Sequence, residues 1–173
     1  LDVVALAMLI LQHSYGKNYL IRSSASFVRS RLGQEERPIL TKKEMGYTRK
    51  GGALILVGSH VPGSTSQLEN LLNLPNVYGL ELDVHKALQY DEEQIISITE
   101  QTNKLLAESK DIVIYTSREV VTGSSPDEYL EIGSTITGAV TEIVSGITIT
   151  PRYVISKGGM TSSNIIVNAL KIK

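Results

Sequence analysis

The sequence predicts an α/β protein with a mostly parallel sheet sandwiched between helices, in a Rossmann-like three-layer architecture. Continuous apolar runs, typical of strands buried on both faces, alternate with amphipathic helical patterns after residue 52. Segments rich in glycine or hydroxyl side chains follow three of these runs, and ligands of parallel sheets bind at such strand ends. The three segments are GSHVPGSTS from Gly58, TSREVVTGSS from Thr116 and SKGGMTSS from Ser156.

The apolar runs predict four strands, at 53–59, 76–84, 111–117 and 152–159. The remaining patterns predict four helices, at 64–74, 91–110, 125–147 and 161–172. The helix at 125–147 has an N-cap candidate in Ser125 and a proline at its first position. The acidic first turn at 91–110 suits the positive end of a helix dipole. For the last helix, Thr161 or Ser162 is the expected N-cap.

The first 52 residues have a different character. Asp2 to Gln12 has the apolar density of a partly buried helix, and residues 18–28, NYLIRSSASFV, favour a strand that runs into a turn. Residues 29–52 are charged and interrupted by glycine and proline, which is typical of a linker. We therefore expect a first part at 1–30, a linker at 31–52 and a domain at 53–173. Because no initiator methionine is present, we expect the chain to start inside a helix of a longer protein.

The composition excludes several functions. The chain has 173 residues, enough for a sizeable core, and a formal net charge of −1, so no global basic field recruits nucleic acid or an anionic membrane. The apolar run at the start has eleven residues including Asp2, whereas a bilayer span needs about 20. Cysteine is absent, which excludes disulfides and suits a cytoplasmic protein.

The first glycine segment resembles a P-loop only in part. The spacing of Gly58 and Gly63 and the hydroxyl of Thr65 match, but Ser64 stands where the motif has its lysine. That lysine supplies charge to the β- and γ-phosphates, so its absence argues against P-loop chemistry. The segment still offers the hydroxyls of Ser59, Ser64 and Thr65 and its backbone amides to a ligand.

The segment SKGGMTSS is open to two interpretations. Gly158 and Gly159 allow close backbone approach, and the free amides of the next helix would form an anion site. The alternative is a tight turn with a hydroxyl cap. Neither glycine segment contains the G-x-G-x-x-G fingerprint of dinucleotide-binding domains. Arg118, just past a strand end, either holds a phosphate or forms a salt bridge with Glu119 or Asp127.

The histidines do not suggest a metal site. His13, His60 and His85 are scattered and lack the spacing of metal ligands. Ser59 and His60 are adjacent, but neighbours on an extended strand point to opposite faces, which argues against a nucleophile and base pair.

Five segments in this order resemble the four-carbon acid sugar kinase family, and the resemblance covers nearly the whole chain. The segments are LIRSSASFVRS, LILVGSHVPGSTSQLENLL, VYGLELDV, DIVIYTSREVVTG and PRYVISKGGMTSSNIIVNAL. The resemblance implies an N-terminal domain that binds a threonate, erythronate or 2-oxo-tetronate, and a C-terminal domain that binds ATP with Mg²⁺. The γ-phosphoryl group then passes to the terminal hydroxyl of the sugar acid.

By this resemblance the chain is the C-terminal domain, preceded at 1–30 by the end of the sugar-acid domain. The nucleotide contacts that it implies are Ser59, Gly158, Gly159, Met160 and Thr161, with a further glycine expected beyond residue 173. The catalytic residues stay unknown and no metal ligand is assigned. The sugar acid would bind through the other domain, so this chain alone is expected to be inactive, and the face left exposed would favour a homodimer.

Two departures from the family pattern leave other hypotheses open. Asn164 stands where many members have an aspartate, and Arg22 matches a family arginine whose role here is not assigned. One alternative is a non-catalytic α/β module that binds a nucleotide or another ligand. Another is a dehydrogenase-type domain, which the missing dinucleotide fingerprint disfavours.

Overall fold

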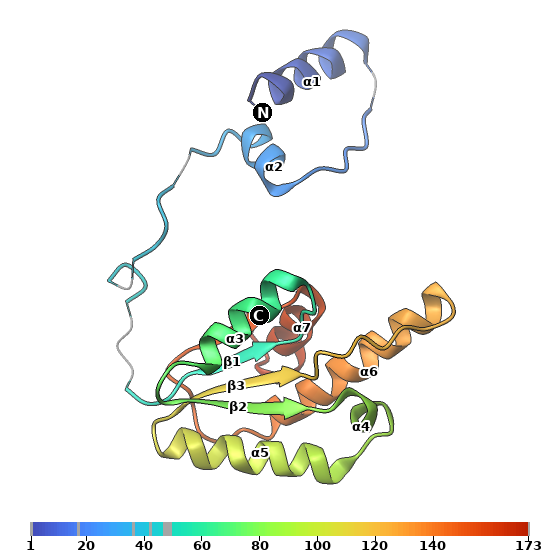
Figure 1. Ribbon diagram of the computed structural model, residues 1–173. Coiled ribbons are helices and arrows are strands. Elements are labelled where there is room, and N and C mark those ends of the chain that lie inside the picture. The colour runs from blue at the N-terminus through green and yellow to red at the C-terminus, as the bar shows by residue number, and fades with distance from the viewer. Residues whose placement is uncertain (1, 17, 36, 42, 47–49, 173) are drawn as a thin grey trace. The chain divides into compact units, whose positions relative to one another are not determined.

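The computed structural model describes residues 2–16, 18–35, 37–41, 43–46 and 50–172 (Figure 1). Contacts divide the chain into two compact units, 1–46 and 47–173. The proposed division into 1–30, 31–52 and 53–173 stays a prediction. None of the helices in the described residues combines the length and the hydropathy that crossing a membrane requires.

The first unit contains two helices. The predicted first helix is confirmed as α1, Asp2–Tyr15, and α2 spans Ala25–Arg31. The strand predicted at 18–28 is wrong: the Ser24 carbonyl accepts bonds from the amides of the third and fourth residues after it and so opens α2. A β-prone segment needs a neighbouring strand to pair with, and the described part of this unit contains no strand.

The second unit confirms the predicted α/β fold and all four strands. The sheet is parallel throughout, with strand order β2-β3-β1-β4. The strands are β1 (Leu54–Val57), β2 (Val77–Leu82), β3 (Asp111–Thr116) and β4 (Val154–Lys157). The two central strands, β1 and β3, are almost entirely buried, which explains their unbroken apolar sequences.

The predicted helices are also present, with one addition. The helices are α3 (Pro62–Leu72), α4 (Val84–Leu88), α5 (Glu92–Ala107), α6 (Pro126–Ser145) and α7 (Gly159–Asn164), which continues as the π-helix η1 (Ile165–Ala169). Ser125 caps α6 as expected, because its hydroxyl accepts a bond from the Glu128 amide at 3.2 Å. The short helix α4 was not predicted, although Asp83 caps it in the ordinary way.

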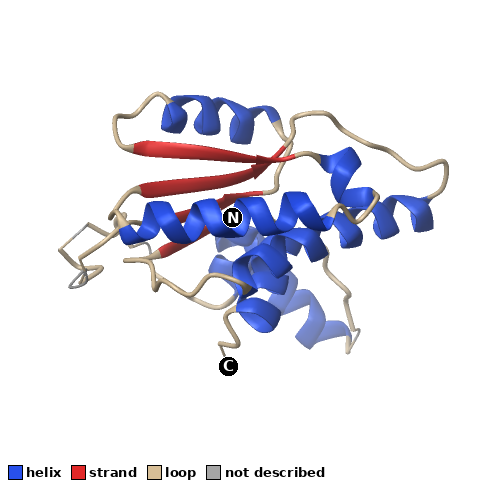
Figure 2. Ribbon diagram, turned by 90° about the horizontal axis from the view of Figure 1, so that it is seen from below, coloured by secondary structure: helices blue, strands red, loops and turns tan. Residues whose placement is uncertain are grey.

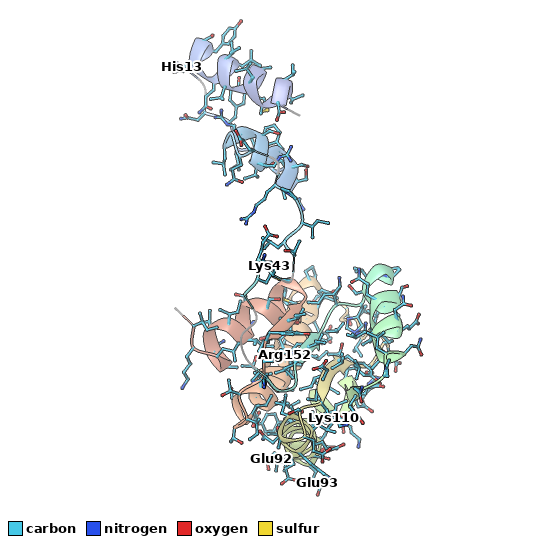
Figure 3. The ribbon with its side chains drawn as sticks, turned by 90° about the vertical axis from the view of Figure 1, so that its left-hand side faces the viewer. His13, Lys43, Glu92, Glu93, Lys110 and Arg152 are labelled. Atoms are coloured by element: carbon cyan, nitrogen blue, oxygen red, sulfur yellow. The ribbon has the colours of Figure 1, made fainter. Side chains whose placement is uncertain are left out.

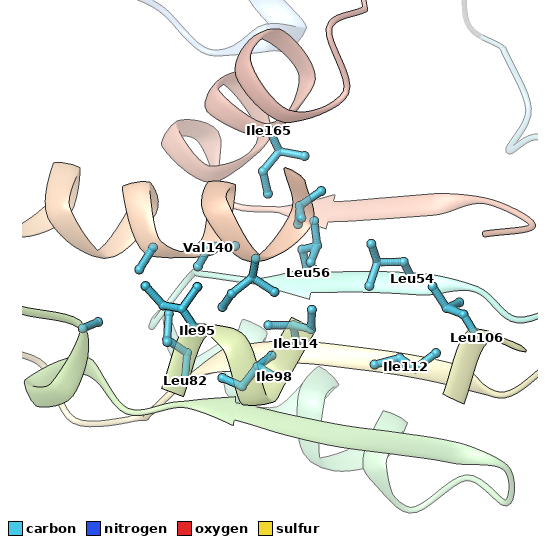
Figure 4. Close-up of a cluster of buried hydrophobic side chains, with 14 residues drawn as sticks. Leu54, Leu56, Leu82, Ile95, Ile98, Leu106, Ile112, Ile114, Val140 and Ile165 are labelled. Carbon is cyan, nitrogen blue, oxygen red and sulfur yellow. The ribbon is translucent and has the colours of Figure 1, made fainter. Parts of the chain in front are cut away.

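Helices cover both faces of the sheet, which gives the three layers (Figure 2). The larger core joins one face of the strands to α5, α6 and η1 and includes Leu56, Ile114 and Ile143, each at most 1% exposed (Figure 4). The smaller core joins the other face to α3, through Leu68 among others. The absence of tryptophan and the single phenylalanine make this an aliphatic core.

Helix α6 is longer than the sheet that it covers. Its 20 residues span about 30 Å, whereas the six residues of β3 span about 20 Å. Because α6 connects two parallel strands, it runs back from the carboxyl edge of the sheet, and its N-terminal half extends beyond that edge (Figure 1).

Arg152 and Lys110 lie at the opposite, amino-terminal edge of the sheet (Figure 3). Arg152 lies 3.2 Å from the carboxylate of Asp111, which also accepts the Ala53 amide at 2.8 Å. Lys110 lies over the ring of Tyr78, 5.6 Å from its centroid. These cations are therefore placed at the end of the sheet away from the glycine loops.

Candidate functional site

A cavity of about 630 Å³ lies at the carboxyl edge of the sheet. The three segments predicted from the strand ends all contribute to its wall: the first through Gly58 to Val61, the second through Glu119 to Val121, and the third through Gly158 to Thr161. Its volume lies within the range of about 300–1,000 Å³ typical of small-molecule sites. The topology therefore gathers distant loops into one site.

The five residues that the resemblance selected all line this cavity: Ser59, Gly158, Gly159, Met160 and Thr161. Ser59 follows β1, and the other four follow β4, its neighbour in the sheet. Their common location makes them walls of one pocket. Contact with a ligand stays a prediction.

The two glycine loops touch each other. A Cβ placed on Gly58 would collide with the side-chain hydroxyl of Thr161, so only glycine allows this approach. Gly158 has a φ of 123° and lies in the left-handed region, where other residues are strained. A Cβ on Gly159, in contrast, would meet no atom within 4 Å, outside the backbone of its own helix. Gly159 lines the cavity and leaves open space at the position of a Cβ.

The start of α7 differs from the prediction. The N-cap is Gly158, not Thr161 or Ser162, and no side chain caps the helix. Thr161 is buried against the first glycine loop, and the Ser162 hydroxyl donates to the carbonyl of Ser156 at 3.2 Å. The helix begins at Gly159, two residues before the predicted start at 161, because the glycine at positive φ turns the chain after β4.

Asn164, the departure from the family pattern, does not cap the helix. Its amide group donates to the carbonyl of Met160 at 3.1 Å, within α7 itself. The Asn168 side chain in turn donates to Asn164 Oδ1 at 3.1 Å. Asn164 is not among the residues that line the cavity in the described part of the chain.

The overhanging half of α6 forms an apolar wall of the cavity. Tyr129, Ile132 and Ile136 contribute to it, and the Met160 side chain packs towards Gly133, 3.1 Å from the position of a Cβ there. Sequence reasoning missed this wall. The sequence contained a signal for it: the predicted helix at 125–147 has 23 residues, and the predicted strand at 111–117 has seven. A helix of that length must extend beyond the strand on which it packs.

The structure excludes a P-loop at the first glycine segment. The amides of Ser64 and Thr65 both donate to the Val61 carbonyl, at 2.8 and 3.2 Å, and thereby form the first turn of α3. Ser64 is only 1% exposed, and its hydroxyl donates to Ser59 Oγ at 3.1 Å. The hydroxyls of Ser64 and Thr65 were also candidates for ligand contact, but neither residue lines the cavity.

His60 and Arg118 have roles that the sequence did not reveal. Strand β1 ends at Val57, so Ser59 and His60 lie in a loop and both line the cavity, contrary to the argument from strand alternation. His60 Nε2 lies 3.0 Å from the Ser117 carbonyl and 3.3 Å from Thr116 Oγ1. Since a carbonyl only accepts, this nitrogen carries the proton.

Arg118 makes neither of its predicted salt bridges in the described part of the chain. Its guanidinium donates to the carbonyl of Ser59 at 2.9 Å and to the carbonyl of Thr116 at 3.0 Å. Burial lowers the pKa of Arg118, and the nearby Glu81 opposes this change. Glu119 instead lies 3.1 Å from His85, and both side chains are mostly exposed.

Residues 54–173 match the family model of the nucleotide-binding C-terminal domain. The chain belongs to this family. A comparison with curated proteins found no match. The match begins at the first residue of β1 and covers the whole sheet and every element that lines the cavity.

The charges around the cavity restrict how this nucleotide-binding domain can hold phosphates. Its described lining contains one carboxylate, from Glu119, and neither lysine nor arginine. Backbone amides and the hydroxyls of Ser59 and Thr161 are therefore the donors that the two loops offer to an anion. No three acidic or histidine side chains among the described residues lie close enough together to hold a metal ion.

Proposed function

We propose that this nucleotide-binding domain binds ATP as part of an enzyme that phosphorylates four-carbon sugar acids. The observation that carries the proposal is that both glycine loops border one cavity, which also has an apolar wall. The resemblance of five ordered segments to the four-carbon acid sugar kinases supports ATP as the nucleotide and a threonate, erythronate or 2-oxo-tetronate as the acceptor.

The residues present fit a nucleotide in one orientation. The apolar side chains of α6, such as Ile132 and Ile136, suit a base. The glycines and hydroxyls at the strand ends suit phosphates, because Gly159 leaves space for close approach. Phosphates beside Glu119 would be repelled, so they belong at the glycine loops rather than near the end of β3.

The described residues do not fit a metal site built from protein ligands alone. Mg²⁺ is usually held by phosphates and waters with only one or two carboxylates, so we expect it to arrive with the nucleotide. The chain's own contribution is then to orient the phosphates through amides and hydroxyls, and to shield the base from water.

A second candidate, a nucleotide-binding module without catalysis, is favoured by one observation. The described lining contains no cation that would stabilise a transferring phosphoryl group. The two candidates share the nucleotide site and differ in whether the longer protein phosphorylates a sugar acid. A phosphorylation assay of that longer protein with threonate and erythronate separates them.

Calorimetric titration of the chain with Mg-ATP, Mg-ADP and NADH tests the nucleotide. We expect adenine nucleotides to bind and NADH not to bind. Gly159→Val should abolish binding without unfolding the domain, because its side chain would enter open space in the cavity. Gly138→Val is the matched control: Gly138 also lies in a helix, has no atom within 4 Å of a Cβ, and does not line the cavity. Equal affinity in the two variants would show that the site is misplaced.

A further inference from the structure

A network of hydrogen bonds joins the first glycine loop to the end of β3. Arg118 Nη1 donates to the Ser59 carbonyl at 2.9 Å. Its Nε and Nη2 atoms donate to the Thr116 carbonyl at 3.2 and 3.0 Å, and Nη2 also reaches Thr116 Oγ1 at 3.1 Å. Thr116 is 2% exposed, so the arginine is anchored on a buried strand end.

The guanidinium is bonded to the protein and is not part of the cavity wall that the structure describes. Arg118 is half-buried and is absent from the described lining of the cavity, although Glu119 next to it belongs to that lining. All three of its nitrogens already donate to oxygens of the protein. Four of its five N–H groups are used in these bonds, so at most one remains for a phosphate, and the geometry does not favour Arg118 as a forked phosphate ligand.

The bond to Ser59 has a consequence for the next amide. The described residues contain no cis peptide bond, and in a planar trans peptide the C=O and N–H groups point in opposite directions. When Arg118 holds the Ser59 carbonyl, the amide of His60 must point away from the arginine. His60 is itself held through its ring, at 3.0 Å from the Ser117 carbonyl.

The side chain of Ser59 is held from another direction. Buried Ser64 donates its hydroxyl to Ser59 Oγ at 3.1 Å. The carbonyl, the side chain and the following residue of this loop are thus each held by a contact from outside the cavity. Donors that are held in place before a ligand arrives lose little entropy on binding.

We propose that Arg118 is a positioning residue: it holds the Ser59 carbonyl and thereby turns the Ser59–His60 peptide so that its amide faces the nucleotide phosphates. The proposal rests on the proposed function, in which the phosphates lie at the glycine loops. Arg118 acts through the loop and does not touch the nucleotide. Its forked geometry matters, because a lysine cannot bridge the Ser59 and Thr116 carbonyls in this way.

The test uses Arg118→Lys, Arg118→Met and the control Lys104→Met in the full chain. Lys104 lies in the last turn of α5, is exposed and does not line the cavity, so the control removes a charge without touching the network. Affinities for adenosine, ADP and ATP are measured by calorimetry at low and high salt. Hydrogen exchange of the Ser59 and His60 amides is measured without nucleotide.

We expect both Arg118 variants to lower the affinity for ADP and the affinity for ATP by the same factor. That factor should be about tenfold, because one hydrogen bond that orders the loop is lost. Adenosine affinity and the salt dependence should stay as in the parent, and both amides should exchange faster. The control should match the parent in every measurement. Arg118→Lys keeps the aliphatic stem and the charge, so it supplies the answer even if Arg118→Met does not fold.

Three results would overturn the proposal. Parent affinity in Arg118→Lys would mean that the charge alone acts. A loss that grows from ADP to ATP, with a weaker salt dependence, would mean that Arg118 contacts phosphate directly. Unchanged affinity in Arg118→Met would mean that it has no role. If the parent binds no nucleotide, the proposed function itself fails. In that case, equal exchange of the Ser59 and His60 amides in the parent and the Arg118 variants would also refute the ordering of the loop by Arg118.

Discussion

The two glycine loops of the cavity are built in different ways. The loop after β1 is held by side chains from elsewhere: Arg118 bonds its carbonyl and Ser64 bonds its serine hydroxyl. The loop after β4 is shaped by its own backbone, because Gly158 takes a φ of 123° and α7 starts at the next residue. Similar glycine patterns in a sequence can therefore meet different physical requirements: Gly58 leaves space for Thr161, whereas Gly158 adopts a backbone conformation that other residues avoid.

This comparison predicts that Gly158→Ala has the largest effect on stability. A non-glycine residue at this φ costs about 1–3 kcal/mol, and urea unfolding of the variant should show a loss of that size. Gly159→Ala is the control, since its Cβ meets nothing within 4 Å and alanine is a better helix residue. Equal stability of the two variants would refute the conformational role of Gly158.

The next effect, of the same order, is expected for Gly58→Ala, where the need is space. Its Cβ would collide with the Thr161 hydroxyl, and such overpacking costs about 1–3 kcal/mol where the neighbour cannot move. In a Thr161→Ala background that collision is removed, so a double-mutant cycle should give a coupling of at least about 0.5 kcal/mol. Additive effects would mean that the two loops do not press on each other.

The side-chain support of the first loop is tested by Ser64→Ala. Its hydroxyl is buried and donates to Ser59 Oγ, so its loss should cost about 1 kcal/mol and weaken nucleotide binding a few-fold. Ser66→Ala serves as the control, because Ser66 is exposed and lies two residues further along the same helix. If Ser64→Ala binds nucleotide as tightly as the parent, the Ser59 hydroxyl needs no support.

The smallest effect is expected at the rim, where His85 and Glu119 lie 3.1 Å apart. Both side chains are mostly exposed, and exposed pairs contribute less than about 1 kcal/mol. His85→Gln should therefore leave the melting temperature almost unchanged. A clear loss of stability would show that this contact organises the loop after β3.

Much of the fold followed from the sequence because the buried parallel strands and capped helices carry strong local patterns. The apolar run at β1, the cap of α6 and the three loops at the strand ends were all predictable. The strand predicted at 18–28 failed because its β-prone residues lack a partner strand in their unit. Local propensity was informative only where the tertiary structure agreed with it.

The site was predictable in its glycines but not in its supports. A sequence shows that Arg118 follows a strand, but not that the loop after the neighbouring strand places the Ser59 carbonyl within reach. The cap at Gly158 was missed because hydroxyl residues are the usual caps, whereas here a left-handed glycine performs the turn. The wall from α6 required comparing the helix length with the strand length.

The central claim is that both glycine loops bind one nucleotide, and an NMR titration of the chain with Mg-ADP tests it most directly. The account predicts that the amides of Ser59, His60, Gly159 and Met160 shift together, with a single dissociation constant. Amides at the amino-terminal edge, such as Asp111, should not shift. Shifts confined to one loop, or centred on the opposite edge, would contradict the claim.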